Sequence, residues 1–153
     1  MQRRTLRLGF RRPDNARWGA AAVEMAIVLP IFVSVVMGIV EFGRAMMVSQ
    51  LVTNSARHGT RLAIVDGATN TSVATAVKTF LQQSTGVAQA DVAVTITVTA
   101  APGNPNPANQ LASAQPKDTC TVAVSVPFNK VAIVTGKFLM STNLKGSCTM
   151  RHE

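Results

Sequence analysis

The chain has 153 residues, which is enough for one domain but not comfortably for two. Only 14% of the residues are charged, against about a quarter in a typical soluble protein, so the composition points toward lipid. The net charge of +8 does not indicate binding to nucleic acid, because most of the positive excess lies ahead of the longest apolar run instead of covering a folded face.

The first nineteen residues read as a basic leader. Six arginines there are opposed only by Asp14, which leaves a net charge of +5: Arg3, Arg4, Arg7, Arg11, Arg12 and Arg17. The basic flank of a membrane helix is normally retained in the cytoplasm. We therefore expect a single-pass protein of the cytoplasmic (inner) membrane, with residues 1–19 cytoplasmic and a C-terminal domain at 67–153 extracytoplasmic.

Residues 20–40, AAAVEMAIVLPIFVSVVMGIV, predict a transmembrane helix in contact with membrane lipid. At 1.5 Å per residue, a helix of this length spans about the hydrocarbon thickness of a bilayer. Pro30 lies inside the run, where membrane helices tolerate proline. A cleavable secretory signal would be shorter and end in a small-x-small site, whereas Val40 is followed by EFGR.

Glu24 is the only ionisable residue in this run, and it has two interpretations. It is either solvated at the headgroup interface or an intramembrane acid with a function, since a carboxylate in hydrocarbon is costly. If a peptidase cut after Gly19, Ala20 would carry a new α-ammonium group four residues from Glu24. The two charges would then neutralise each other, within one chain or between neighbours in a filament.

Three motifs between residues 19 and 63 carry a resemblance to a known family: VEMAIVLP at 23–30, GIVEFGR at 38–44 and ARHGTR at 56–61. This stretch resembles the TadE-like proteins of the tight-adherence (Tad, or Flp) pilus systems. The resemblance implies a minor pilin or pseudopilin in a hetero-oligomeric assembly with other pilins. It also implies cleavage between Gly19 and Ala20 by a prepilin peptidase, with Glu24 as the characteristic acid.

The match departs from the family mildly at Met25, where an aromatic or other apolar residue often follows the acid. Beyond residue 63 the resemblance becomes loose.

The helical pattern continues beyond the membrane, because residues 41–65 contain no proline. We expect one long helix from about Ala20 to Ile64, with an extension at 41–66 that ends near Gly67, which can take a left-handed cap conformation. Helical spacing places one broad stripe of residues on a common face: Met47, Leu51, Asn54, His58 and Leu62. Arg57 and Arg61, four residues apart, would contact either lipid phosphates or a neighbouring subunit.

Residues 72–83 predict a short amphipathic helix, with Asn70 or Thr71 as its N-cap and Gly86 closing it. Its apolar face comprises Val73, Ala76, Val77, Phe80 and Leu81. Alternating β-branched residues predict strands at 91–99 and 119–128 and a last one at about 143–150. A proline-rich surface loop is expected at 100–117, and residues 131–140 remain undecided.

The expected fold is therefore α+β. It is pilin-like, with a long N-terminal transmembrane-plus-exposed helix followed by a short helix and a small antiparallel sheet of about three strands.

Cys120 and Cys148 lie far beyond the membrane segment, where an oxidising compartment would favour a disulfide. The last strand would put Cys148 opposite Cys120 if the two strands were antiparallel neighbours. Such a bond would stabilise a small domain by roughly 2–4 kcal/mol. The alternative is two free thiols.

The sequence offers no catalytic motif, and we expect neither an enzyme nor a cofactor. His58 and His152 lack metal-ligand spacing, and a zinc site built from Cys120, Cys148 and His152 lacks it too. The main hypothesis is a TadE-like minor pilin that helps to assemble a Tad/Flp-type pilus or related secretion apparatus for adhesion. The alternatives are an uncleaved, membrane-tethered binding module and, third, an anchored enzyme.

Overall fold

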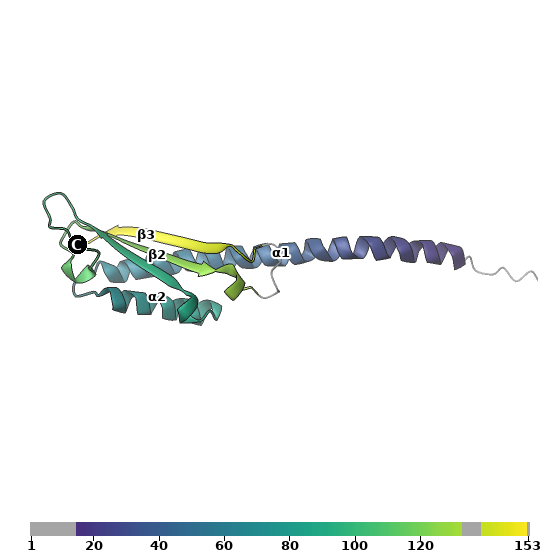
Figure 1. Ribbon diagram of the computed structural model, residues 1–153, viewed down its shortest axis with the longest axis horizontal. Coiled ribbons are helices and arrows are strands. Elements are labelled where there is room, and N and C mark those ends of the chain that lie inside the picture. The colour runs from purple at the N-terminus through teal and green to yellow at the C-terminus, as the bar shows by residue number, and fades with distance from the viewer. Residues whose placement is uncertain (1–14, 133–138, 153) are drawn as a thin grey trace, which may run out of the picture. The chain divides into compact units, whose positions relative to one another are not determined.

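A computed structural model describes residues 15–132 and 139–152. Its elements are α1 (Asn15–Ala63), α2 (Asn70–Thr85), β1 (Ala93–Thr99), β2 (Thr119–Pro127) and β3 (Asn143–Arg151), with the short 3-10 turns η1 (Gln89–Asp91), η2 (Leu111–Ser113) and η3 (Phe128–Lys130). The predicted α+β fold is confirmed: a long apolar helix, a shorter helix and a three-stranded antiparallel sheet (Figure 1). The chain divides into two compact units, residues 1–37 (the first unit) and residues 38–153 (the second, or outer, unit).

The described part of the first unit is helical, as the beginning of α1. Pro30 lies inside this helix, and the Ser34 hydroxyl donates a hydrogen bond of 2.9 Å to the Pro30 carbonyl. Every side chain from Trp18 to Met37 is exposed, although most of them are apolar. By length and composition, α1 could cross a membrane, which fits a single-pass membrane protein.

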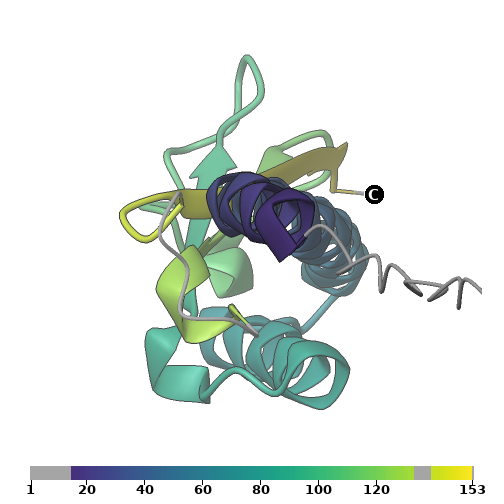
Figure 2. The ribbon, with the colours of Figure 1, turned by 90° about the vertical axis from the view of Figure 1, so that its right-hand side faces the viewer.

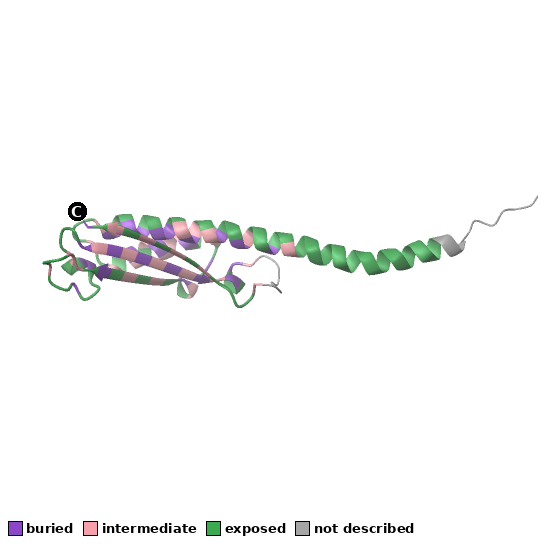
Figure 3. Cartoon of the chain, turned by 90° about the horizontal axis from the view of Figure 1, so that it is seen from above, coloured by how far each residue is buried: buried purple, intermediate pink, exposed green. Residues whose placement is uncertain are grey.

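The second unit is built on a sheet in the order β1-β2-β3 with both pairs antiparallel. The central strand β2 shows the alternation of a half-buried strand, because four even-numbered residues are buried: Cys120, Val122, Val124 and Val126 (Figure 3). The three predicted strands are confirmed to within two residues at each end. Their odd-numbered residues form the opposite face of the sheet, which is more exposed.

The C-terminal half of α1 and the whole of α2 pack on this buried face (Figure 2). Two glycines mark the closest approaches. A Cβ atom at Gly59 of α1 would lie 2.5 Å from Val77 Cγ2 in α2 and 3.3 Å from Val122 Cγ1 in β2. At Gly146 of β3, a Cβ atom would lie 2.8 Å from the Thr53 Cα atom of α1.

Apart from Glu41, the buried stripe of α1 consists of small and medium-sized residues: Ala45, Val48, Val52, Ser55, Ala56, Gly59, Thr60 and Ala63. The stripe singled out from the sequence lies on another face, since Met47, Asn54, His58 and Leu62 are exposed and Leu51 is half-buried. The reason is the short distance between α1 and its neighbours, which only small side chains allow. Side-chain volume, and not hydrophobicity alone, selects the buried face.

The second helix has the predicted apolar face, of which Val73, Val77 and Leu81 are fully buried. The predicted N-cap was wrong. Thr69 caps the helix in a capping box with Ser72, whereas the Asn70 side chain donates a hydrogen bond to the Asn109 carbonyl. The closing role of Gly86 is confirmed by its left-handed φ of 77°.

Candidate functional site

The residues expected to govern processing lie on the first unit. Gly19, Ala20 and Glu24 are exposed residues of α1, and a Cβ atom at Gly19 would meet nothing within 4 Å. On an α-helix, residues four apart share one face. A new chain end at Ala20 would therefore begin on the face that carries the Glu24 carboxylate.

In the second unit, two polar residues of α1 hold the segments next to the sheet. Glu41 is buried, and one of its carboxylate oxygens accepts a hydrogen bond of 2.8 Å from the Leu139 N–H. Arg44 donates from Nε to the Val131 carbonyl (3.1 Å) and from Nη2 to the Thr85 carbonyl (3.4 Å). We call Glu41 and Arg44 the α1 latch. Of the undecided segment 131–140, residues 133–138 lie outside the described residues.

Nearer its C-terminal end, α1 holds the sheet itself. The buried Thr60 hydroxyl lies 2.7 Å from the Ala56 carbonyl oxygen in its own helix and 3.2 Å from the Cys148 carbonyl oxygen of β3. Beside it, Gly59 lets α2 and β2 approach the helix backbone. The C-terminal half of α1 is thus fixed to the other elements of the outer unit by polar contacts at two levels, with small, mostly apolar residues between them.

The comparison with protein families covers this same helix. Residues 19–61, less than a third of the chain, match the family model described as TadE-like protein. This segment is TadE-like. The match begins at Gly19 and includes Glu24, the α1 latch and the Gly59–Thr60 contact, which confirms the resemblance carried by the three motifs. Searches of the curated proteins and of the solved structures gave no significant match.

Arg57 and Arg61 of the TadE-like segment are both exposed, and neither forms an ion pair with a residue that the structure describes. Between them in sequence, His58 packs on Phe80 of α2, with ring centroids 5.9 Å apart. Contact of the two arginines with lipid or with a neighbouring subunit stays a prediction.

The predicted disulfide is wrong. Both cysteines are free, Cys120 buried and Cys148 half-buried. The strands are antiparallel neighbours as expected, but the register pairs Cys148 with Val122 and Cys120 with Met150. Such diagonal neighbours lie about 7–8 Å apart, outside the usual Cα–Cα range of a disulfide. Burial, together with the charge of Asp118, raises the pKa of the Cys120 thiol, so it stays protonated.

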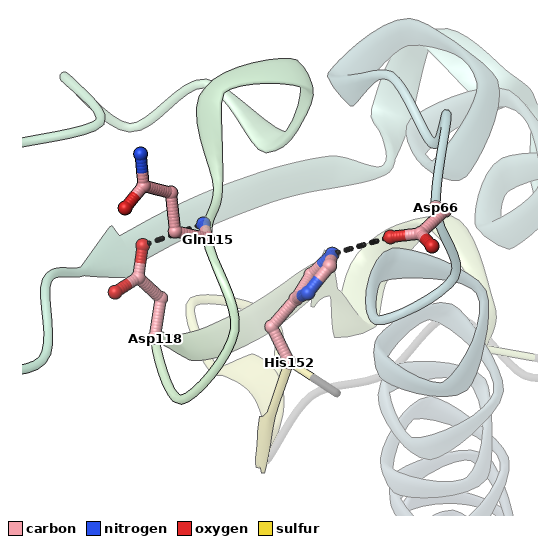
Figure 4. A network of polar contacts seen from close by, with 4 residues as sticks. All are labelled: Asp66, Gln115, Asp118 and His152. Atoms are coloured by element: carbon pink, nitrogen blue, oxygen red, sulfur yellow. Dashed lines mark hydrogen bonds and ion pairs between the residues drawn. The ribbon is translucent and has the colours of Figure 1, made fainter. Parts of the chain in front are cut away.

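The proline-rich loop before β2 is organised by one buried carboxylate, Asp118 (Figure 4). The Gln115 N–H donates to Oδ2 (2.9 Å), while the Ala101 N–H (2.9 Å) and the Asn104 side-chain amide (2.7 Å) donate to Oδ1. These donors stabilise the charged form, with Gln115 contributing most, and they hold the pKa of Asp118 below its usual value.

Two further contacts close the same end of the outer unit. His152 is buried, and its backbone N–H donates a hydrogen bond of 2.7 Å to the Asp118 carbonyl. Its ring nitrogen Nε2 lies 4.0 Å from Asp66 Oδ1 (Figure 4). Asn70 in α2 donates to the Asn109 carbonyl (2.8 Å) and accepts from the Leu111 N–H (2.9 Å). Sequence reasoning missed these roles, although an acid directly between a proline-rich loop and a strand was a usable clue.

Within residues 15–132 and 139–152, the structure places no group of three His, Cys, Asp or Glu side chains where they could hold a metal ion.

Replacing Asp118 with asparagine should lower the melting temperature of the full-length protein at pH 7, because an amide nitrogen would then face one of the N–H donors. The folded-state pKa is depressed, so the stabilisation is present above pH 3.8 and is lost as the pH falls through the folded pKa. The difference between wild type and variant should therefore shrink at pH 3. Differential scanning calorimetry of the protein in detergent at both pH values measures it.

The control is Asp66→Asn, because the Asp66 side chain is 96% exposed and surface ion pairs contribute little. An equal loss of stability at pH 7 and pH 3 would contradict this account of Asp118.

Proposed function

We propose that the chain is a TadE-like minor pilin or pseudopilin that takes part in assembling a Tad/Flp-type pilus or a related secretion apparatus. The observation that carries this proposal is the TadE-like match over residues 19–61, which associates the chain with Tad-type pilus systems. In this proposal the protein contributes helix packing to an adhesive structure and performs no catalysis. Its partners are membrane lipid, a prepilin peptidase and other pilins.

The positive charge of the leader gives a physical reason for its removal. Residues 1–19 carry a net +5, and pulling that charge through hydrocarbon opposes any movement of the helix away from the cytoplasm. Cleavage after Gly19 would remove this charge and leave one α-ammonium group at Ala20. Glu24 could then neutralise it, so the mature helix would leave the bilayer at a much lower electrostatic cost.

Helix packing would supply the contacts between subunits. From Trp18 to Met37 the side chains of α1 are exposed all round, so a neighbouring helix can pack there without disturbing the core of the outer unit. In lipid, helices associate through close packing and polar contacts, because burial from lipid gives no hydrophobic gain. Arg57 and Arg61 would extend this contact above the membrane.

The test is mass spectrometry of the mature N-terminus, in cells with and without the prepilin peptidase of the same system. A chain that begins at Ala20 only when the peptidase is present supports the proposal. Gly19→Val should block cleavage, whereas Gly43→Val, on the same helix but away from the site, should not. An intact N-terminal leader in the wild-type protein would contradict processing and favour the uncleaved, tethered binding module.

A further inference from the structure

The sheet of the outer unit has an open edge at β1. The order β1-β2-β3 gives β1 one partner only, and the Val98 N–H donates to Asn109 Oδ1 (3.2 Å) instead of to β2. In an antiparallel ladder, alternate residues direct both backbone groups away from the partner strand. Val94 and Ile96 therefore present their N–H and C=O groups at this edge, and no group among the described residues outside the sheet binds them.

Strand β1 also lacks the features that usually protect an edge. Its sequence, AVTITVT, has no charged residue and no proline, and it pairs with β2 over its whole length without a bulge. The opposite edge strand, β3, carries Lys145 and Arg151 and is packed against α1 at Gly146. The β3 edge is thus protected by charge and by contact with α1, whereas the β1 edge is not. This difference is expected if only β1 accepts a further strand.

A groove of about 360 Å³ runs beside the open part of this edge. Val94 and Ile96, both half-buried, contribute its apolar side, and α2 forms the other side with Asn70, Thr71, Ala74, Thr75 and Lys78. The residues with open backbone groups are thus the ones whose side chains line the groove. A strand added here would gain main-chain hydrogen bonds and place alternate side chains in the groove.

Charge indicates what kind of strand fits. The described residues of the outer unit include eight Lys and Arg side chains but only four acids, and each acid is already engaged: Glu41 with Leu139, Asp66 with His152, Asp91 with Lys130 (3.2 Å) and Asp118 with its loop. Lys78 forms no ion pair with any described residue. A carboxylate on the incoming segment would complement it.

We propose that the β1 edge and the groove beside α2 bind an extended segment of an acidic partner protein as a fourth strand. The segment alternates apolar residues, which cover Val94 and Ile96, with polar ones, and it carries a carboxylate beside Lys78. None of the residues that line this groove belongs to α1, and the proposal does not depend on leader cleavage or on pilus assembly.

The experiment uses the full-length protein in lipid nanodiscs and a set of extended peptides with alternating valine and threonine. One group carries glutamate, a second carries lysine at the same positions, and a third has proline at alternate positions. Amide hydrogen exchange measured by NMR reports on each strand residue. Glutamate peptides should slow exchange at Val94 and Ile96 about tenfold or more, while Thr95 and Thr97, already paired with β2, should not change.

Two charge reversals serve as a matched pair. Lys78→Glu should weaken binding of the glutamate peptides about tenfold and favour the lysine peptides, because the carboxylate then faces a like charge. Lys145→Glu, on β3 and outside this groove, should leave the preference unchanged. Thermal melts of both variants check that the fold is intact.

The proposal is overturned if no peptide slows exchange at Val94 and Ile96, or if glutamate and lysine peptides bind equally well. Protection of the same two amides in a dimer without peptide would overturn it in favour of a second copy of this chain. The N-terminus found by mass spectrometry should be the same in Lys78→Glu, so a failure here is distinct from a failure of the proposed function.

Discussion

Replacing Gly146 with alanine is expected to destabilise the outer unit by about 1–3 kcal/mol or more, the range for overpacking a tight contact. The added Cβ atom would lie 2.8 Å from the Thr53 Cα atom and 2.9 Å from the Thr53 nitrogen. Both are backbone atoms of α1 and cannot rotate away as a side-chain tip could. Strand β3 must therefore move off the helix or lose its register with β2.

Hydrogen exchange of the β2 amides in the full-length protein measures this loss, because the helix that remains in detergent would dominate a circular dichroism signal. Gly43→Ala is the matched control, since a Cβ atom there meets nothing within 4 Å and alanine is the better helix former. Unchanged protection of Val122 and Val124 in Gly146→Ala would show that the contact with Thr53 relaxes at little cost.

Replacing Glu24 with alanine is expected to reduce incorporation into the assembled apparatus roughly 100-fold. Without the carboxylate, the α-ammonium group of a chain that begins at Ala20 has no counter-charge in the bilayer. An unpaired charge there costs roughly 2.5–3.5 kcal/mol, which corresponds to this factor. Quantitative immunoblotting of sheared surface fractions against membrane fractions gives the ratio directly.

Glu24→Asp keeps the charge and should retain most of the incorporation, while Glu24→Gln should behave like alanine. Mass spectrometry of each variant separates a failure of cleavage from a failure of assembly. If Glu24→Ala is cleaved and incorporated as well as wild type, Glu24 is only a solvated acid at the headgroup interface.

The sequence carried enough information for the elements but not for the way they meet. The apolar run, which tolerates Pro30 as a membrane helix does, and the proline-free stretch 41–65 predicted α1 to within five residues at either end. Alternating β-branched residues predicted all three strands. Both patterns are local consequences of which side of an element is buried. The apolar run alone predicted one membrane span, whereas the length of α1 also needed the helical pattern beyond residue 40.

Register and close contacts depend on partners that are distant in sequence. The disulfide prediction failed because nothing near Cys120 or Cys148 specifies that Val122 stands opposite Cys148. The buried stripe of α1 was missed because alanine, serine and threonine carry little hydrophobic signal. They are buried because β3 packs closely on the helix at Gly146, and this contact is distant in sequence. The role of Asp118 needs three donors from a loop whose path no periodicity describes.

The α1 latch and the Thr60 contact share a property that bears on sequence change. Four hydrogen bonds that they form with the rest of the outer unit end on main-chain atoms: the Leu139 N–H and the carbonyl oxygens of Val131, Thr85 and Cys148. Because the partner atoms belong to the backbone, these bonds do not depend on which side chains the partner residues carry. These four bonds can therefore persist when sheet side chains change, provided that Gly146 keeps its close contact with Thr53, which is consistent with a family match that stops at residue 61.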